Sequence, residues 1–513
     1  MLTTLRLAFG LSFASLVASC AVGPNFTPPD PDLPQRSFFG DAQKSGQTSL
    51  EPPDPDWWAL FKDRELTALE RRVAAANLDV QTATMRLAES RFQRGVTASA
   101  LFPSLNSNGS YEREKASANG LLGLFGQQTP GTEASGAFGT GAGGAPTNLA
   151  TTLSSPFSLW QQGFDASWEL DLWGKVRREV EAADAQVDVA ADQRRDILIS
   201  SLAELARDYV QLRGIQEQIK IARDNLTTAN DILSVTQERS QKGLVTGLDV
   251  ENAAAEEESI RAEIPDLERQ ESEQINALSL LLDEPPGRLA AELAAPRALL
   301  LHAPLLPVGI PSELARRRPD IRQAEAQLHA ATANIGVAVG DFYPSVTLNG
   351  SVGFQALDLT NLWKGSSLQY AMGPNVTLPI FEGGRLRATL ELRDAQQQEA
   401  AIAYHETVLK AWHDVVNALV AYRTEQERRQ DLKLQVQHAS AALDLARSRY
   451  NDGVAQFITV LDAERTLLSA EQQLALSATN VAVDIVALYK ALGGGWETTF
   501  PVEPPAPIAI EAP

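Results

Sequence analysis

The sequence predicts a mainly α-helical protein that also contributes strands to a membrane β-barrel. Two observations support this fold class. First, residues 164–253 align with residues 374–463 at a constant offset of 210 without a gap, so that Gly174 falls on Gly384. Second, short segments with a period of two precede two long proline-free segments with a helical period. A repeat of this length is a twofold duplication and not a solenoid array.

Four segments alternate apolar and polar residues, and each is about as long as a tilted membrane strand. They lie at about 104–114, 157–172, 345–356 and 368–381. Such alternation places one set of side chains on each face of a sheet. A soluble sheet would bury its apolar face, whereas a membrane barrel turns that face to lipid and its polar face to a water-filled lumen. The alternation alone leaves both alternatives open; the N-terminus and the long helices favour the barrel.

The N-terminus predicts export and lipidation. Arg6 and the apolar run Leu7–Val17 have the pattern of a signal peptide that is too short to span a membrane. The following Val17-Ala18-Ser19-Cys20 resembles a bacterial lipobox, which implies a signal peptide over 1–19 and N-acyl and S-diacylglycerol groups on Cys20. Two or more acyl chains anchor a protein stably, and Ala21 implies sorting to the outer membrane. The alternative is a plain secretory signal.

Residues 174–241 and 384–451 each predict one long helix. Neither contains proline, and apolar residues step by three and four in both, which is a heptad seam. At 1.5 Å per residue each helix is roughly 100 Å long. Return helices are expected at 248–282 and 458–492, and Pro265 is expected to interrupt and bend the first of them.

The remaining segments complete the domain organisation. After Cys20 comes an extended lipidated segment, and two repeats flank an equatorial belt of the helical body. A glycine- and threonine-rich loop at 115–156 is expected at the extracellular end, with a shorter partner at 356–367. The boundaries are 20–61 for the extended segment, 62–282 and 312–495 for the repeats, 283–311 for the belt and 496–513 for a proline-rich tail.

Composition excludes several functions. The net charge of −21 argues against a nucleic-acid partner. The five histidines do not occur at metal-ligand spacing, and neither a phosphate loop nor a nucleophile elbow is found, so no enzyme and no cofactor is expected. Four strands cannot close a barrel, which predicts an oligomer. Two chains would make eight strands and a plugged lumen, and three would make twelve strands and an open pore.

Several ordered motifs resemble one family. They are Cys20-Ala21-Val22-Gly23-Pro24-Asn25-Phe26, Trp57-Trp58, Arg317-Arg318-Pro319-Asp320-Ile321, Phe342-Tyr343-Pro344-Ser345 and Leu461-Asp462-Ala463. Over residues 20–495 the chain is similar to the TolC-like outer-membrane efflux family, in the NodT-type lipoprotein branch that serves tripartite RND-type pumps. The resemblance implies a homotrimer, with a 12-stranded β-barrel in the outer membrane continued by a 12-helix α-barrel in the periplasm.

That resemblance implies a passive exit duct for small molecules such as drugs or toxic compounds. Its partners would be a periplasmic adaptor protein, an inner-membrane RND transporter and outer-membrane lipid. One alternative is the outlet of a type I protein secretion system, which uses the same fold. Another is a periplasmic coiled-coil scaffold, which would explain the heptads but not the four alternating strands.

The family resemblance also assigns residues to the far ends of the long helices. The turns would dock the adaptor through Gly243, Leu244, Val245, Gly453, Val454 and Ala455. Helix capping is the alternative role of these turns. The periplasmic gate would consist of Asp462, Ile458, Asp249 and Thr459. Three copies of Asp462 would form an acidic ring, and because like charges repel, a divalent cation at this ring is a hypothesis; no resident metal is expected.

A run of acidic residues precedes these turns. Asp184, Asp188, Asp192 and Asp196 recur every four residues, which predicts either a solvated outer face or a negatively charged lumen wall. Asp165, Glu169 and Asp171 fall on the polar face of the strand at 157–172. If both sets line the lumen, the channel prefers cations.

Overall fold

The structure is a computed structural model. It describes residues 21–31, 48–49, 51, 54–115, 156–297, 306–309, 314 and 316–497. Cys20, the predicted signal peptide, nearly all of the 115–156 loop, part of the predicted belt and most of the predicted tail lie outside these residues. The chain divides into two compact units. Unit 1 is Met1–Asn25, Arg94–Glu181 and Ala333–Asp394, and unit 2 is Phe26–Gln93, Ala182–Thr332 and Ala395–Pro513.

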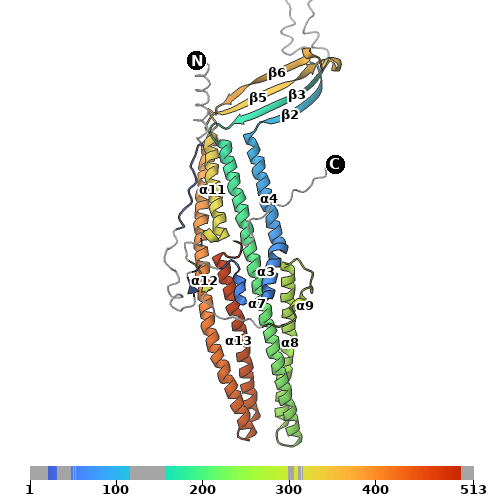
Figure 1. The fold of residues 1–513 in the computed structure, drawn as a ribbon, viewed down its shortest axis with the longest axis vertical. Coiled ribbons are helices and arrows are strands. Elements are labelled where there is room, and N and C mark those ends of the chain that lie inside the picture. Colours follow the sequence, from blue (N-terminus) through green and yellow to red (C-terminus); the bar gives the residue numbers. More distant parts are fainter. Residues whose placement is uncertain are drawn as a thin grey trace, which may run out of the picture. The chain divides into compact units, whose positions relative to one another are not determined.

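Unit 1 contains a four-stranded antiparallel sheet. Its strands are β2 (Ser104–Glu114), β3 (Phe157–Leu170), β5 (Ser345–Ala356) and β6 (Leu368–Thr377), in the order β2-β3-β5-β6 (Figure 1). The alternating segments therefore form strands, as predicted. The last strand ends at Thr377 and not near residue 381, because Thr377 lies opposite Ser345, where its partner strand β5 begins.

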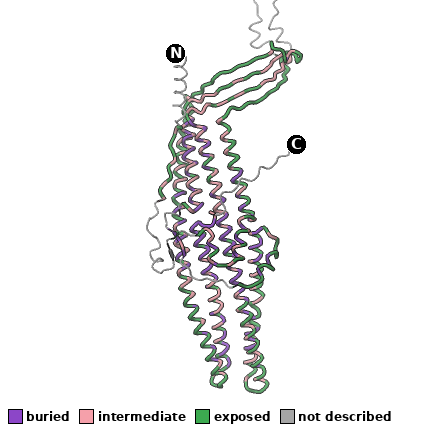
Figure 2. Tube along the Cα trace, viewed as in Figure 1, coloured by how far each residue is buried: buried purple, intermediate pink, exposed green. Residues whose placement is uncertain are grey.

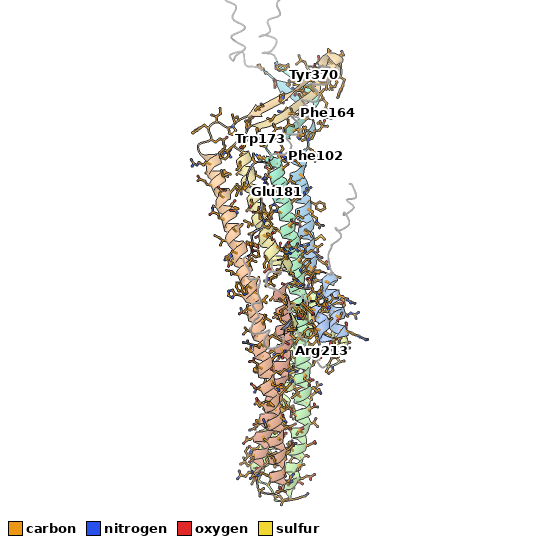
Figure 3. The ribbon with its side chains drawn as sticks, turned by 60° about the vertical axis from the view of Figure 1, so that its left-hand side comes forward. Phe102, Phe164, Trp173, Glu181, Arg213 and Tyr370 are labelled. Carbon is orange, nitrogen blue, oxygen red and sulfur yellow. The ribbon has the colours of Figure 1, made fainter. Side chains whose placement is uncertain are left out.

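The strand register collects the apolar side chains on one face. Phe164 lies opposite Val352, which in turn lies opposite Tyr370 on β6. The other face is polar, with Asp165 of β3 opposite Ser351. Phe164 and Tyr370 are 51% and 76% exposed (Figure 3). An exposed apolar face of this kind is what a lipid-facing barrel wall requires.

The two long helices repeat each other. α7 (Lys175–Gln241) and α12 (Arg385–Asn451) both have 67 residues, and their ends differ by the predicted offset. The return helices are α8 (Gly247–Leu281) and α13 (Phe457–Leu492). The predicted interruption at Pro265 is wrong, because α8 is one helix with this proline inside it. The ring is exposed, so the carbonyl that loses its partner one turn earlier can bond water.

The other elements are shorter. Among the described residues they are α3 (Arg64–Ala76), α4 (Leu78–Ala98), α9 (Ala290–Leu293), α11 (Pro319–Gly340), the two-residue strands β1 (Thr48–Ser49) and β4 (Leu306–Pro307), and the 3-10 turns η1 (Trp57–Phe61), η2 (Ser99–Leu101), η3 (Leu359–Asn361) and η4 (Gly365–Ser367). β1 and β4 pair in parallel, so a strand of the extended N-terminal segment joins the end of the belt.

The main core lies in unit 2, where α3, α7 and α13 pack together and buried residues gather (Figure 2). Trp57 of the sequence motif stacks on Tyr489 of α13 at 5.5 Å. α13 contains an 18-residue window with a mean hydropathy of 1.3, which is apolar enough to cross a membrane, but half of that window is buried. Ile485 and Leu488 belong to this core, so the hydropathy of α13 reflects its packing.

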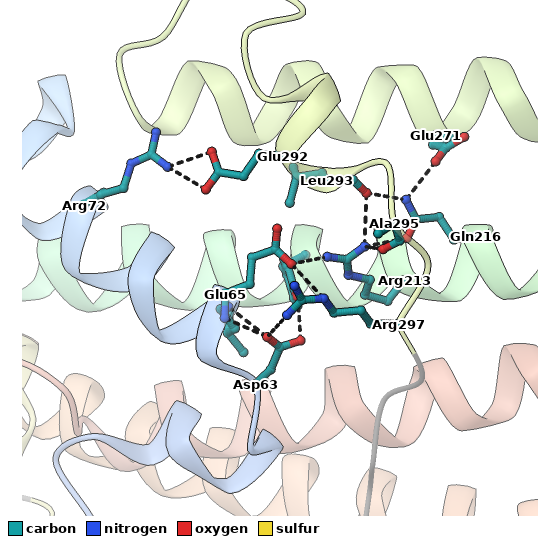
Figure 4. Close-up of polar contacts among 12 residues, drawn as sticks. Asp63, Glu65, Arg72, Arg213, Gln216, Glu271, Glu292, Leu293, Ala295 and Arg297 are labelled. Atoms are coloured by element: carbon teal, nitrogen blue, oxygen red, sulfur yellow. Dashed lines mark hydrogen bonds and ion pairs between the residues drawn. The ribbon is translucent and has the colours of Figure 1, made fainter.

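Arg213 of α7 is the polar centre of the same unit. Its guanidinium lies 2.7 Å from the Glu65 carboxylate of α3 and donates to the carbonyls of Leu293 and Ala295 at 3.1 and 2.8 Å (Figure 4). Gln216 also donates to the Leu293 carbonyl, at 2.8 Å. These bonds fasten the part of the predicted belt around α9 to α3 and α7.

Candidate functional site

Of the three carboxylates predicted for the polar face of β3, the structure places two there. Asp165 accepts a hydrogen bond of 2.6 Å from the Asn108 side chain, and Glu169 lies on the same face. Asp171 does not belong to this face, because β3 ends at Leu170. Its carboxylate instead accepts from the backbone N–H groups of Val176 and Arg177 at 3.1 and 3.0 Å, at the start of α7. The alternation continues past the strand end, so it could not show this role.

The two tip turns have the same geometry. Gly243 and Gly453 have φ values of 69° and 74°, which only glycine adopts without strain. The following amides, those of Leu244 and Val454, each donate 2.9 Å back to an arginine carbonyl, as in a Schellman ending. Leu244 is 70% exposed and Val454 is 66% exposed.

Each turn therefore presents an exposed apolar side chain directly after its glycine. Val245 and Ala455, the next residues, are half-buried. Helix capping fully accounts for the two glycines. Contact with an adaptor stays a prediction for the exposed side chains.

The predicted gate residues fall into two groups. Asp249 lies in the first turn of α8 and accepts hydrogen bonds from the backbone N–H and the hydroxyl of Thr246, at 2.9 and 2.8 Å, so its carboxylate caps the helix. Ile458, Thr459 and Asp462 are exposed on the first turns of α13. In the part of the chain that the structure describes, the Asp462 carboxylate has no ion-pair partner.

A ring of Asp462 side chains would need further copies of the chain, and it stays a prediction. Among the described residues no group of three or more His, Cys, Asp or Glu side chains could hold a metal. Within one chain, therefore, the gate residues do not make a cation site.

Contacts next to the gate escaped the sequence analysis. Arg465 of α13 pairs with Glu256 of α8, and the buried residues Ala253, Phe457 and Leu461 pack together beside them. Glu464 is also buried, with Arg447 at 3.8 Å, and burial raises the pKa of its carboxyl group. Arg465 and Glu256 lie 209 positions apart, and Ala253 is about as distant from Phe457 and Leu461, so no local pattern could have revealed these contacts.

The acidic run on α7 is neither a uniform solvated face nor a uniform lumen wall. Asp184 and Asp188 are exposed, whereas Asp192 is 3% exposed and pairs with Arg195 and, at 3.3 Å, with Arg322. Asp196 lines a cavity of about 470 Å³. A spacing of four drifts by about 40° per step, so the run turns through roughly 120° and passes from solvent into the protein interior.

Part of the Arg-Arg-Pro-Asp motif lines the same cavity. Arg318 lies 2.7 Å from Asp320 and 3.3 Å from Asp414, and it donates 2.9 Å to the carbonyl of Ala491. The preceding Arg317 pairs with Glu497 at 3.0 Å. The motif therefore joins the start of α11 to α12 and to the end of α13, which is a structural role.

Comparison with known proteins agrees with this architecture. Residues 69–284 and 310–494 match the family described as "Outer membrane efflux protein". The chain is 31% identical to the toluene efflux pump outer membrane protein TtgF of Pseudomonas putida, over 96% of this chain and 97% of that protein. It is 30% identical to Nodulation protein T of Rhizobium leguminosarum bv. viciae, over 94% and 92%.

Solved channels have the same fold. The outer-membrane channel OprN superposes with a TM-score of 0.81 at 33% identity, covering 93% of this chain and 100% of that one. The Campylobacter jejuni CmeC outer membrane channel superposes with a TM-score of 0.78 at 24% identity, covering 93% and 95%. This chain therefore belongs to the outer membrane efflux protein family and is an outer-membrane efflux channel that extends into the periplasm.

Proposed function

We propose that this chain forms a homotrimer that serves as the passive exit duct of a tripartite pump for small molecules. An inner-membrane RND transporter would supply the energy, and a periplasmic adaptor would contact the helix tips. Acyl groups on Cys20 would add a lipid anchor to the barrel. The observation that carries the proposal is the pair of free sheet edges in unit 1.

Among the described strands, β2 and β6 each pair on one side only. An unpaired edge next to an apolar face cannot persist in lipid, where every backbone N–H and carbonyl needs a partner within the protein. Pairing β2 of one copy with β6 of the next removes both edges. Three copies give twelve strands and a barrel with an open lumen.

The helices next to both edges support the same assembly. α4 precedes β2 and exposes Leu78, Met85, Phe92 and Val96, which share one helix face. α12 follows β6 and exposes a second stripe at spacings of 7, 11, 14 and 11, formed by Ile402, Leu409, Val420, Leu434 and Leu445. Such stripes along the helices next to each edge suit contacts between copies.

The relatives support small molecules as cargo. Their names refer to toluene efflux, antibiotic efflux and pyoverdine export. The polar face of the sheet offers hydroxyl, amide and carboxylate groups, which suits a duct that conducts many solutes. Selection among solutes would then rest with the transporter.

Native mass and planar-bilayer conductance of the detergent-purified protein test this proposal together. We expect a heat-modifiable trimer that conducts ions. Ile402→Glu, which puts a charge on the α12 stripe, is expected to yield monomers, whereas Lys410→Glu at an exposed position beside the stripe is expected to leave the trimer intact. A monomeric, non-conducting wild-type protein would refute the duct.

A further inference from the structure

We propose that residues Ala21–Asn25 are a strap that fixes the lipid-modified end of the chain beside the sheet, and that Arg178 is the residue that positions it. The inference rests on the proposed acylation of Cys20. Its basis is a set of contacts within unit 1, which also contains the sheet.

The strap is bonded to the first turn of α7. The Val22 N–H donates to the Trp173 carbonyl at 3.0 Å. Arg178 is 3% exposed and donates to the Val22 carbonyl at 3.2 Å and to the Asn25 side-chain oxygen at 2.7 Å. Glu181, one turn further along α7, pairs with the same guanidinium at 2.7 Å. Trp173 and Glu181 mark the two ends of this contact (Figure 3).

Close packing holds the strap as well as hydrogen bonds. Gly23 has a φ of 90°, and a Cβ atom there would lie 2.5 Å from the Cα of Gly336 on α11. A Cβ on Gly336 would lie 2.8 Å from the Arg178 side chain, and one on Gly174 would lie 2.6 Å from the Cα of Ala21. Three glycines thus allow the strap, α11 and the Arg178 stem to pack in direct contact. A flexible tether would not need such close packing.

The strap is also tied to the sheet. Trp173 follows β3 by three residues, its ring stacks on Tyr343 at 4.9 Å, and its indole N–H donates 2.8 Å to the Pro344 carbonyl just before β5. The residue that accepts from Val22 is therefore anchored at the ends of both central strands. A lipid on Cys20 would then be held close to the membrane-facing sheet, where it can act on barrel insertion as well as on membrane attachment.

A double-mutant cycle tests this role, with trimer recovered from the outer membrane as the readout. Arg178→Met removes the donors but keeps the stem that packs on Gly336. Cys20→Ser behind a non-lipoprotein signal peptide removes the lipid. We expect Arg178→Met to lower trimer recovery about five-fold or more in the acylated protein and to have little further effect in the Cys20→Ser protein.

A second pair of variants, with a smaller change, shows whether the effect of Arg178→Met is only misfolding. Asn25→Ala removes one acceptor of Arg178, and Asn25→Asp keeps it. We expect Asn25→Ala to show a smaller, lipid-dependent loss and Asn25→Asp to behave as the wild type.

Two outcomes would overturn the inference in different ways. Equal losses with and without the lipid would make Arg178 a purely structural residue and leave acylation standing. An intact mass without acyl groups on the mature wild-type chain would refute the acylation itself, and the inference with it.

Discussion

Arg213 of α7 and Glu65 of α3 form an ion pair of 2.7 Å, with side chains that are 1% and 9% exposed (Figure 4). The guanidinium also lies 4.8 Å from the centre of the Tyr209 ring. Tyr209 in turn donates 2.6 Å to Asp63, the residue that caps α3. One buried cation therefore connects the long helix, the start of the first repeat and the belt.

Arg213→Ala is expected to be strongly destabilising. It leaves buried Glu65 with the exposed Arg297, at 3.3 Å, as its ion-pair partner and removes a donor from the Ala295 carbonyl. Breaking a buried pair on one side costs about 3–5 kcal/mol, and the remaining Arg297 places the loss at the lower end. The melting temperature of the detergent-purified protein measures the loss. Arg269→Ala is the control, because the ion-pair partners of Arg269 among the described residues, Asp266 and Glu273, are both exposed. Equal melting temperatures for the two variants would show that the Arg213 cluster contributes little.

Gly214→Ala tests a close approach of α7 and α13. A Cβ atom at Gly214 would lie 2.2 Å from the Thr479 hydroxyl, whereas one at Gly95 of α4 would have nothing within 4 Å. We expect Gly214→Ala to destabilise by about 1–3 kcal/mol through overpacking. Gly95→Ala is expected to stabilise by about 0.5–1 kcal/mol through helix propensity. Adding Thr479→Ala to Gly214→Ala removes the clashing hydroxyl and methyl groups. The double variant is then expected to regain most of the lost stability, as measured by thermal unfolding.

Asp462→Asn tests the acidic ring at the gate. Neutralising three carboxylates removes their mutual repulsion and their attraction for cations. We expect larger currents through the channel. We also expect that about ten-fold more divalent cation is needed for the same block of the current, which corresponds to a loss of about 1.4 kcal/mol in cation binding. Single-channel recording measures both quantities. Asp444→Asn changes an exposed charge on α12 and is the control. Unchanged block by divalent cations in Asp462→Asn would exclude the ring as their site.

Asp484 of α13 is expected to make stability depend on pH. Burial, together with the nearby Glu425, raises the pKa of its carboxyl group to about 6. Because the folded pKa exceeds the unfolded value, the stabilising contribution is complete below about pH 4 and is lost as pH rises through about 6.

Asp484→Asn removes this titration. Its melting temperature is expected to match the wild type near pH 4 and to exceed it increasingly towards pH 8. A constant difference between the two proteins over this range would contradict the shifted pKa.

The sequence by itself determined the elements and their repetition. The bounds of α7 and α12, the positive-φ glycines at both tips and the four strands follow from local periods of 3.6 and 2 and from glycine at the turns. Periodicity is a property of neighbouring residues, so one sequence is enough to show it. The expected interruption at Pro265 was wrong, because the local rule takes no account of the exposed position of this proline in the folded chain.

Only the tertiary structure decided the roles of individual charged residues. Asp192, for which the sequence left a solvated face and a lumen wall open, is buried and pairs with Arg322, 130 positions away. Arg178 and Arg213 have no sequence signal at all, because their partners Asn25 and Glu65 lie about 150 positions away. The partner of a carboxylate or guanidinium is the polar group that folding brings into contact with it. Which group that is depends on how distant segments of the chain pack.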